Sequence, residues 1–228
     1  MKNSANIKQM FDNIAKNYDK LNNIMTFHQH LNIKERAIKN VNLNTNAKIL
    51  DVCTGTGDIA IYIAQNVVKS GKVIGVDFSE NMLALAKEKA RGVKNLEFKF
   101  ADALALPFED GEFDACFISF GLRNLTDLKD GLKEMKRVTK KGGFIINLDT
   151  GKPTGIVRIF HELFFFKIVP LFGKLFNGND APYKYLPEST KEFPSADELV
   201  EIFKELGLTN VRKVDFLFGA ISEQIGQV

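Results

Sequence analysis

Short apolar runs alternate with stretches of helical periodicity from Ala47 onward. Runs with the length of a buried strand occur at Lys48–Val52, Lys72–Val76, Leu96–Phe100, Phe113–Ser119 and Phe144–Leu148. Amphipathic helices are predicted between them, over Asp58–Val68, Ser79–Ala90 and Thr126–Thr139. Such an alternation of strands and helices predicts a parallel, doubly wound α/β sheet.

The end of the chain adds a helix and two more strands. Ser195–Leu206 has a serine at its N-cap, an apolar stripe, and Gly207 as its stop signal. Asn210–Phe218 and Gly219–Val228 then read as two strands joined with almost no loop. Added to the five earlier strands, they predict a seven-stranded, mostly parallel sheet.

Two helical additions flank this predicted sheet within a single domain, residues 1–228. Residues 1–45 contain helical patterns at Ile7–Tyr18 and Ile33–Val41, with an apolar stretch between them. We expect this segment to form a lid over the ligand site, with Tyr18 and Asp19 in a connection between helices. A Tyr18 packed on the surface beside an Asp19 cap is the alternative. Residues 151–192 form the second addition, a helical insertion before the last helix.

Composition narrows the class of protein. The chain has 228 residues, of which 45% are hydrophobic and 26% charged, which is typical of a soluble globular protein. A net charge of +3 is too small to indicate nucleic-acid binding. Two cysteines provide neither a disulfide framework nor metal-ligand spacing, so we expect a reducing, cytoplasmic location. The N-terminus lacks the apolar core of a signal peptide, and no stretch is apolar enough to span a membrane.

A glycine-rich turn follows the first predicted strand. Gly55 and Gly57 stand two residues apart, and Asp58 opens the next helix. A strand–turn–helix unit of this kind lets backbone amides and a helix N-terminus approach a ligand. Asp77 ends the second strand, where a carboxylate can bind both ribose hydroxyls of an adenosine group. The pattern predicts a nucleotide-type site.

The charges around this turn favour one class of nucleotide. Residues 55–60 also fit the dinucleotide pattern G-x-G-x-x-A. Asp51 and Asp58, however, would repel a pyrophosphate at short range, whereas S-adenosylmethionine carries an ammonium and a sulfonium group. Asp58 as a simple helix N-cap is the alternative, but that leaves Asp51 unexplained. We therefore predict a methyl-donor site.

The ends of the third and fourth strands supply further candidates, because ligands lie at the carboxyl ends of parallel strands. Asp102 could accept a hydrogen bond from an adenine amino group, or be an ordinary turn residue. Arg123, in the run Phe120–Asn124, is expected to point into the crevice and to need an acidic partner or an anionic substrate. A surface pair with Glu134 or Asp127 is the alternative.

Several motifs occur in an order that resembles one known family. They are Phe11-x-x-Ile14-Ala15-x-x-Tyr18-Asp19, Leu50–Asp58, Asp77 with Asn81-Met82-Leu83, Leu106-Pro107-Phe108, Ser119–Asn124 and Tyr185–Ser189. Together they resemble the quinone C-methyltransferases of menaquinone and ubiquinone biosynthesis, of the demethylmenaquinone methyltransferase type, over almost the whole chain. The resemblance implies the class I methyltransferase fold, S-adenosylmethionine as donor, and a prenylated quinol as acceptor.

The chemistry of such a reaction suggests roles for particular residues. A quinol carbon becomes nucleophilic when a neighbouring hydroxyl loses its proton, so the site must stabilise a phenolate. Arg123 can hold the oxyanion, and the proton would pass to a water held by Arg123, Asn124 and Tyr18. The predicted donor-binding residues are Asp51, Thr54, Gly55, Gly57, Asp58, Asp77, Phe78, Met82, Asp102, Ala103 and Ser119. No metal is expected, since His28 and His30 would not share a helix face.

Three features depart from the family pattern. His28 stands where the family usually has Gly, Ile33 where it has Trp, and Ser222–Gln224 where the last strand has a His and a basic residue. These positions fall in the lid and on the acceptor side of the predicted site. They therefore bear on the acceptor more than on the donor.

The stretch Ile156–Phe176 is strongly apolar but is interrupted by charged residues. It cannot span a bilayer, and we expect an interfacial helix pair that forms a peripheral membrane face or a tunnel for a lipid tail. A core-packing insertion or a contact between two copies in a homodimer is the alternative.

Three other functions stay open: a dinucleotide-dependent oxidoreductase, a methyltransferase of another lipophilic molecule, and a non-catalytic membrane-binding module.

Overall fold

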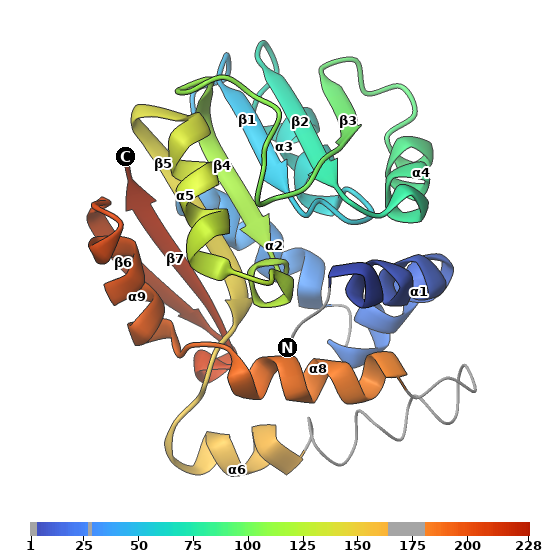
Figure 1. The fold of residues 1–228 in the computed structure, drawn as a ribbon, viewed down its shortest axis with the longest axis vertical. Coiled ribbons are helices and arrows are strands. Elements are labelled where there is room, and N and C mark those ends of the chain that lie inside the picture. Colours follow the sequence, from blue (N-terminus) through green and yellow to red (C-terminus); the bar gives the residue numbers. More distant parts are fainter. Residues whose placement is uncertain (1–3, 27–28, 164–180) are drawn as a thin grey trace.

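The computed structural model describes residues 4–26, 29–163 and 181–228, and it centres on a seven-stranded sheet (Figure 1). The strand order is β3-β2-β1-β4-β5-β7-β6. Strands β1 to β5 pair in parallel, whereas β7 is antiparallel to both β5 and β6. The predicted doubly wound, mostly parallel sheet is confirmed.

The strand bounds follow the apolar runs closely. The strands are β1 Lys48–Val52, β2 Lys72–Asp77, β3 Leu96–Phe100, β4 Phe113–Ser119, β5 Thr139–Thr150, β6 Thr209–Phe216 and β7 Ile221–Gln227. Strand β5 is much longer than the predicted Phe144–Leu148, because Thr139 already pairs with Phe113 across an irregularity in register. The turn η3 (Leu217–Gly219) joins β6 to β7 through three consecutive residues with positive φ.

Helices cover both faces of the sheet. On one face α2 (Gln29–Lys39), α3 (Asp58–Asn66) and α4 (Glu80–Lys89) bury Ile38, Ile63 and Leu83 in one apolar cluster with residues of the sheet. On the other, α5 (Leu128–Val138) and α9 (Ala196–Glu205) bury Leu132 and Phe203. The predicted serine caps form: Ser79 accepts from the amide of Met82, and Ser195 makes a capping box with Glu198. Both faces of the sheet are thus apolar and packed against helices.

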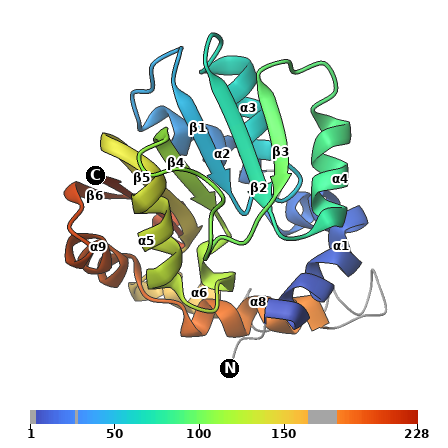
Figure 2. The same ribbon diagram turned by 45° about the horizontal axis from the view of Figure 1, so that its top comes forward.

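Two further helices lie across the edge at which β1–β4 end. They are α1 (Ser4–Met25) and α8 (Ala181–Glu192), and α6 (Gly155–Leu163) lies beyond α8 (Figures 1 and 2). The predicted break at Tyr18 and Asp19 is wrong, since both lie inside α1. Asp19 occupies a mid-helix position because its carboxylate accepts hydrogen bonds from Thr56 and Lys89 across the interface. His28 lies outside the described residues.

None of the helices within the described ranges has both the length and the apolar content needed to cross a membrane.

Candidate active site

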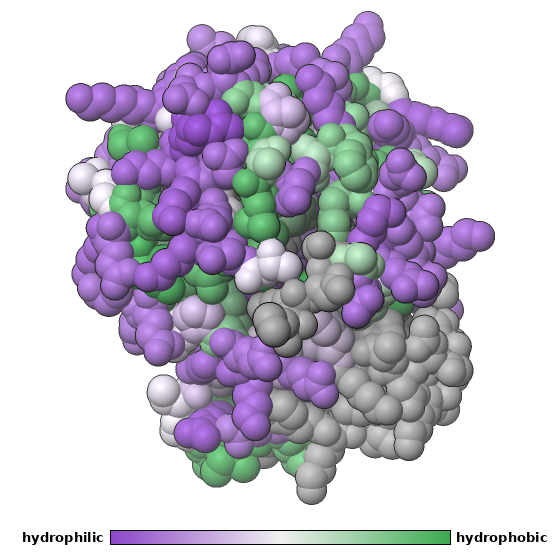
Figure 3. Space-filling view, in the orientation of Figure 1, coloured by the Kyte–Doolittle hydropathy of each residue, from purple (hydrophilic) through white to green (hydrophobic). Residues whose placement is uncertain are grey.

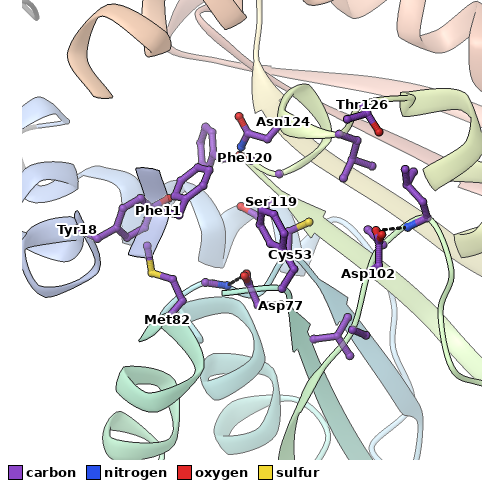
Figure 4. Close-up of a pocket in the computed structure, with 18 residues that line it drawn as sticks. Phe11, Tyr18, Cys53, Asp77, Met82, Asp102, Ser119, Phe120, Asn124 and Thr126 are labelled. Atoms are coloured by element: carbon purple, nitrogen blue, oxygen red, sulfur yellow. Dashed lines mark hydrogen bonds between the residues drawn. The ribbon is translucent and has the colours of Figure 1, made fainter. Parts of the chain in front are cut away.

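A cavity lies at the carboxyl ends of β1, β2, β3 and β4, beneath α1 (Figure 4). Phe11 and Tyr18 of α1 close one side of it, and the loop after β3 closes the other. The lining residues are Phe11, Tyr18, Cys53, Gly55, Val76, Asp77, Phe78, Met82, Ala101, Asp102, Ala103, Leu104, Ser119, Phe120, Gly121, Asn124, Leu125 and Thr126. Nine of these belong to the set predicted from sequence: Tyr18, Gly55, Asp77, Phe78, Met82, Asp102, Ala103, Ser119 and Asn124.

The glycine loop after β1 needs unusual backbone angles. Cys53, Gly55 and Gly57 all have positive φ, at 55°, 56° and 86°. A Cβ at position 57 would lie 2.9 Å from a ring carbon of Phe98, so this position requires glycine on two counts. Gly57 shapes the loop and precedes α3 as its N-cap, but it does not line the cavity.

Asp51 is buried at the end of β1 with one oxygen engaged. The hydroxyl of Thr54 donates to Oδ2 over 2.5 Å, while Oδ1 has no hydrogen-bond partner among the residues described. Burial raises the pKa of this carboxyl to about 7, against the stabilising effects of Thr54, Lys34 and the amide of Ala60. A buried acceptor without a partner is costly and favours a cationic donor from a ligand.

Asp58 opens α3 and is held by two lysines. Lys34 of α2 donates to Oδ2 over 2.8 Å, and Lys89 of α4 donates to Oδ1 over 2.5 Å. Although burial opposes ionisation, the two ammonium groups hold the pKa of Asp58 well below its usual range. Asp58 lines the smaller cavity described below, but two lysines already balance its charge. The negative charge that favours a cation lies on Asp51.

Asp77 ends β2 and faces the cavity. Its Oδ2 accepts from the amide of Gly55 over 2.8 Å, and its Oδ1 accepts from the amide of Ser79 over 2.9 Å. Burial raises the pKa of Asp77, although these amides favour the charged form. Each carboxylate oxygen has two acceptor sites, so both can still bind a ribose hydroxyl.

The remaining predicted donor residues lie around Asp77. Met82 is buried against Phe11 and Tyr18 of α1, and Phe78 and Ala103 line the same space. Asp102 is on the opposite side of the cavity, where its carboxylate accepts from the amide of Leu104 over 2.9 Å (Figure 4). It is thus both a turn residue and a cavity residue, so the two interpretations of Asp102 are compatible.

The loop after β4 approaches the loop after β1 closely. Phe120 has a φ of 54°, in the left-handed region, like Cys53 on the neighbouring strand. A Cβ at Gly121 would lie 2.6 Å from the Cβ of Cys53. Ser119, just before this turn, has a buried hydroxyl with no hydrogen-bond partner in the described part of the chain. Strained backbone at two adjacent strand ends is a feature of ligand sites.

Arg123 forms a buried ion pair with Asp149 at the end of β5. Nη1 donates to Oδ1 of Asp149 over 2.6 Å and to the carbonyl of Phe120 over 2.7 Å. Arg123 does not line the cavity, so the expected direction of its side chain is wrong, whereas the acidic partner expected as one possibility is present in Asp149. The surface alternatives are wrong as well, because Glu134 binds Arg137 and Asp127 caps α5. Sequence reasoning missed Asp149, although it directly follows a predicted strand.

Asn124 does face the cavity, and a tyrosine of α8 supports it. The hydroxyl of Tyr185 donates to Oδ1 of Asn124 over 3.0 Å, and Nδ2 of Asn124 donates to the carbonyl of Phe120 over 3.1 Å. Burial raises the pKa of Tyr185, so its hydroxyl stays protonated and able to donate. The motif containing Tyr185 was visible in the sequence, but nothing there connected it with Asn124.

A second, smaller cavity adjoins the first. It shares Tyr18, Cys53, Gly55 and Ser119 with the larger one, and Asp51, Thr54 and Asp58 also line it. Among the residues described, no group of three or more His, Cys, Asp or Glu side chains could hold a metal ion. Asp77 for a ribose and Asp51 with Ser119 for an ammonium group fit an adenosine ligand that has an amino-acid end.

Comparisons with known proteins agree with this arrangement. The model of the ubiE/COQ5 methyltransferase family matches residues 1–227. Demethylmenaquinone methyltransferases from strains of Staphylococcus aureus are 42% identical over 225 residues, which is 98% of this chain and 93% of theirs.

Solved structures share the fold at low sequence identity. A SAM-dependent methyltransferase from Aquifex aeolicus aligns with a TM-score of 0.63 and 24% identity, covering 86% of this chain and 89% of that one. A putative methyltransferase from Haloferax volcanii, solved with the Trm112 activator, aligns with a TM-score of 0.70 and 17% identity, covering 95% and 96%. These structures support the class I methyltransferase fold.

Proposed function

The chain belongs to the ubiE/COQ5 methyltransferase family and is an S-adenosylmethionine-dependent methyltransferase, and we propose that it methylates a ring carbon of demethylmenaquinol. The similarity to demethylmenaquinone methyltransferases carries the choice of acceptor. Family membership sets aside the dinucleotide-dependent oxidoreductase that Gly55–Ala60 had left open.

We assign the donor to the larger cavity and the smaller one beside it. Asp77 would bind the ribose hydroxyls, Asp102 would face the adenine, and Asp51 would receive the ammonium group. When bound, the donor supplies a sulfonium methyl group for in-line transfer. The residues that support this assignment most directly are Asp51 and Ser119, because each has a buried oxygen without a partner in the described ranges.

We assign acceptor contacts to Tyr18 of α1 and Asn124 of η1, which both line the cavity. Tyr18 and the amide of Asn124 can orient a water that takes the quinol proton, which raises the electron density of the ring. Phe11 and Phe120 provide apolar surface for a planar ring and exclude bulk water. Leu125 and Thr126, which also line the cavity, would bound the acceptor on the η1 (Leu122–Asn124) side.

Arg123 keeps a role in this proposal, but a different one from a free cation. Asp149 offsets much of its charge, so direct stabilisation of a phenolate by Arg123 is weakened. Its guanidinium and its backbone amide both bind Asp149, and its Nη1 also holds the carbonyl of Phe120. We therefore assign Arg123 to fixing the turn that carries Asn124, with a residual electrostatic contribution to the acceptor.

The test is transfer of a labelled methyl group from S-adenosylmethionine to a chemically reduced, short-tailed demethylmenaquinol without oxygen. Methylation of the quinol, and none of the oxidised quinone, is the expected result, because only the reduced ring is electron-rich. If the donor binds by calorimetry but no quinol is methylated, the methyltransferase assignment stands and the acceptor assignment is wrong. Ubiquinone and phylloquinone precursors in reduced form are the next acceptors to assay.

We further propose that the protein works as a peripheral protein on the inner face of the cell membrane, where a prenylated quinol resides. In the described part of the segment 156–176, Ile156, Ile159 and Leu163 lie on one face of α6 and are 71%, 65% and 48% exposed. Figure 3 shows apolar surface over α6 at the lower edge of the molecule. Such an amphipathic helix can lie in a bilayer interface.

The turn η3 carries another exposed apolar residue, close to the segment that leads into α6. Phe218 is 85% exposed, and the amide of Gly151, shortly before α6, donates to the carbonyl of Ala220 over 2.9 Å. Co-sedimentation with anionic phospholipid vesicles tests the proposal. Ile156→Ser with Ile159→Ser should lower the bound fraction, whereas Phe100→Ser, which removes an exposed aromatic from β3, should not. Equal binding by both variants would contradict a membrane face, and loss of a dimer from Ile156→Ser would assign the face to a second copy.

A further inference from the structure

Three charged side chains line the smaller cavity: Asp51, Lys34 and Asp58, of which Asp58 is bound by Lys34 and Lys89. Asp51 comes from the end of β1, and Lys34 comes from α2, the second helix of the N-terminal segment. The hydroxyl of Ser119 lies in the same lining. A cavity that presents a carboxylate and an ammonium group side by side is complementary to a zwitterion.

Lys34 has bonding capacity beyond its visible contact. Its side chain is only 13% exposed, and Nζ donates to Oδ2 of Asp58 over 2.8 Å. An ammonium group carries three N–H donors, so this contact leaves donors for a ligand. Asp58 in turn shares its charge with Lys89, which also binds Asp19 of α1. Lys34 therefore shares Asp58 with a second lysine, and it also interacts electrostatically with Asp51 in the same lining.

We infer that Lys34 binds the carboxylate of the donor's methionyl end, while Asp51 and Ser119 receive its ammonium group. The inference rests on S-adenosylmethionine as donor and adds a residue outside the glycine loop to the donor site. The two charged groups of an α-amino acid are attached to one carbon, so a single small cavity must satisfy both. The unpartnered oxygens of Asp51 and Ser119 provide acceptors for the ammonium group, and Lys34 provides a donor for the carboxylate.

This assignment makes α2 part of the donor site. Without it, Lys34 would serve only to hold α2 on α3 through Asp58. The two roles differ in one measurable respect: a ligand-binding Lys34 discriminates between ligands with and without an amino-acid end, whereas a purely structural one affects both equally. Lys89 gives a matched control, since it also binds Asp58 but lines neither cavity.

Calorimetry on the full chain separates these roles without an acceptor. The ligands are S-adenosylhomocysteine, which has the amino-acid end, and 5′-methylthioadenosine, which lacks it. Lys34→Met should lower the affinity for S-adenosylhomocysteine by about 10- to 100-fold, which is the effect of losing a charge-assisted hydrogen bond. Binding of methylthioadenosine should change less than about twofold. Lys89→Met should leave the ratio of the two affinities near its wild-type value.

A second measurement needs no variant, in case Lys34→Met does not fold. Wild-type protein should bind decarboxylated S-adenosylmethionine about 10- to 100-fold more weakly than S-adenosylmethionine itself. Equal affinity for these two ligands, or equal weakening of both adenosine ligands by Lys34→Met, overturns the inference. If the wild type binds S-adenosylhomocysteine but Lys34→Met binds it equally well, only the inference falls. If the wild type does not bind it at all, the donor assignment falls too.

Discussion

Asp149 binds Arg123 at two points, accepting from the guanidinium Nη1 over 2.6 Å and from the backbone amide over 3.3 Å. Both residues are buried, at 1% and 8% exposure. The pair ties the end of β5 to the turn η1, which carries Asn124 beside the cavity. The ion pair therefore holds a turn that lines the cavity, although Arg123 and Asp149 do not line it.

Replacing Asp149 should therefore destabilise the protein and lower its activity together. Asp149→Asn leaves a buried guanidinium without its charge partner, which costs about 3–5 kcal/mol in the free energy of unfolding. Urea unfolding monitored by circular dichroism measures this. Glu205→Gln is the control, because it removes an exposed pair with Lys129 and should cost less than about 1 kcal/mol. A loss of similar size in both variants would contradict the buried-pair account.

A double replacement separates the effect of the Arg123–Asp149 pair on stability from its effect on methyl transfer. Arg123→Leu with Asp149→Leu removes both charges at once, so unfolding free energy should return to within roughly 1–2 kcal/mol of wild type. Methyl transfer to the quinol should stay at least about tenfold below wild type at saturating quinol, since the carbonyl of Phe120, to which Asn124 donates, is no longer anchored by Arg123. Full recovery of turnover in this variant would exclude any catalytic contribution of Arg123.

Donor binding should depend on pH through Asp51. Its pKa is raised to about 7 by burial, and the charged form is the one that binds an ammonium group. Affinity for S-adenosylhomocysteine should therefore rise on the order of tenfold from pH 6 to pH 8, as Asp51 loses its proton. Lys34, Asp58, Asp77, Tyr18 and Cys53 also face or neighbour this carboxylate.

Calorimetry across this range with Asp51→Asn identifies the titrating group. The variant should bind S-adenosylhomocysteine weakly, with little change between pH 6 and pH 8. Methylthioadenosine, which carries no ammonium group, should show a flat profile on the wild type. A slope that persists in Asp51→Asn would assign the titration to one of the neighbouring groups.

Glu223 of β7 should make stability fall as pH rises. It is fully buried, Oε2 accepts from Asn40 over 2.6 Å, and burial raises its pKa to about 7 from 4.5. Between these two values the folded state retains a proton that the unfolded chain has lost, so unfolding free energy decreases through this window. Glu223→Gln should be more stable than wild type by roughly 2 kcal/mol at pH 8 and equal to it at pH 4.

Denaturant unfolding at both pH values tests this, with Glu201→Gln as an exposed control on α9. A gain in unfolding free energy that is the same at pH 4 and pH 8 would indicate a packing effect and not titration.

The neighbouring Ser222 and Gln224 depart from the family pattern and are buried. They are joined by a hydrogen bond of 3.0 Å, and Gln224 also accepts from Asn147. These hydrogen bonds join β5 to β7, while Oδ1 of Asn147 and Oε1 of Glu223 are buried without a partner among the described residues.

The contacts of Asp19 should control how firmly α1 covers the cavity. Its two oxygens accept from Thr56 over 2.6 Å and from Lys89 over 2.9 Å. Asp19→Ala should speed dissociation of S-adenosylhomocysteine several-fold and increase hydrogen exchange in α1, because one of its polar anchors is lost. Lys20→Ala, at an exposed position on the same helix, is the control. Unchanged dissociation in Asp19→Ala would mean that apolar packing of Ile14 and Ala15 suffices.

The sequence by itself determined the sheet and many of the residues that line the cavity. Buried strands are apolar over a fixed short length, so β1 and β3 begin and end where the pattern predicts. Parallel strands place their carboxyl ends at one edge, which is why Asp77, Asp102 and Ser119 could be assigned to a common cavity. The serine caps of α4 and α9 could also be predicted from the sequence, because capping depends on residues three positions apart.

Only the tertiary structure decided the partners of the charged residues. Arg123 meets Asp149, 26 positions away, and Asp58 meets lysines of α2 and α4, 24 and 31 positions away. Local pattern carries no information about such pairs, since any exposed or buried acid could have served. The same holds for Asp19, whose place inside α1 depends on Thr56 and Lys89 across the interface. Local periodicity fixes elements, whereas long-range packing fixes which charges are free to meet a ligand.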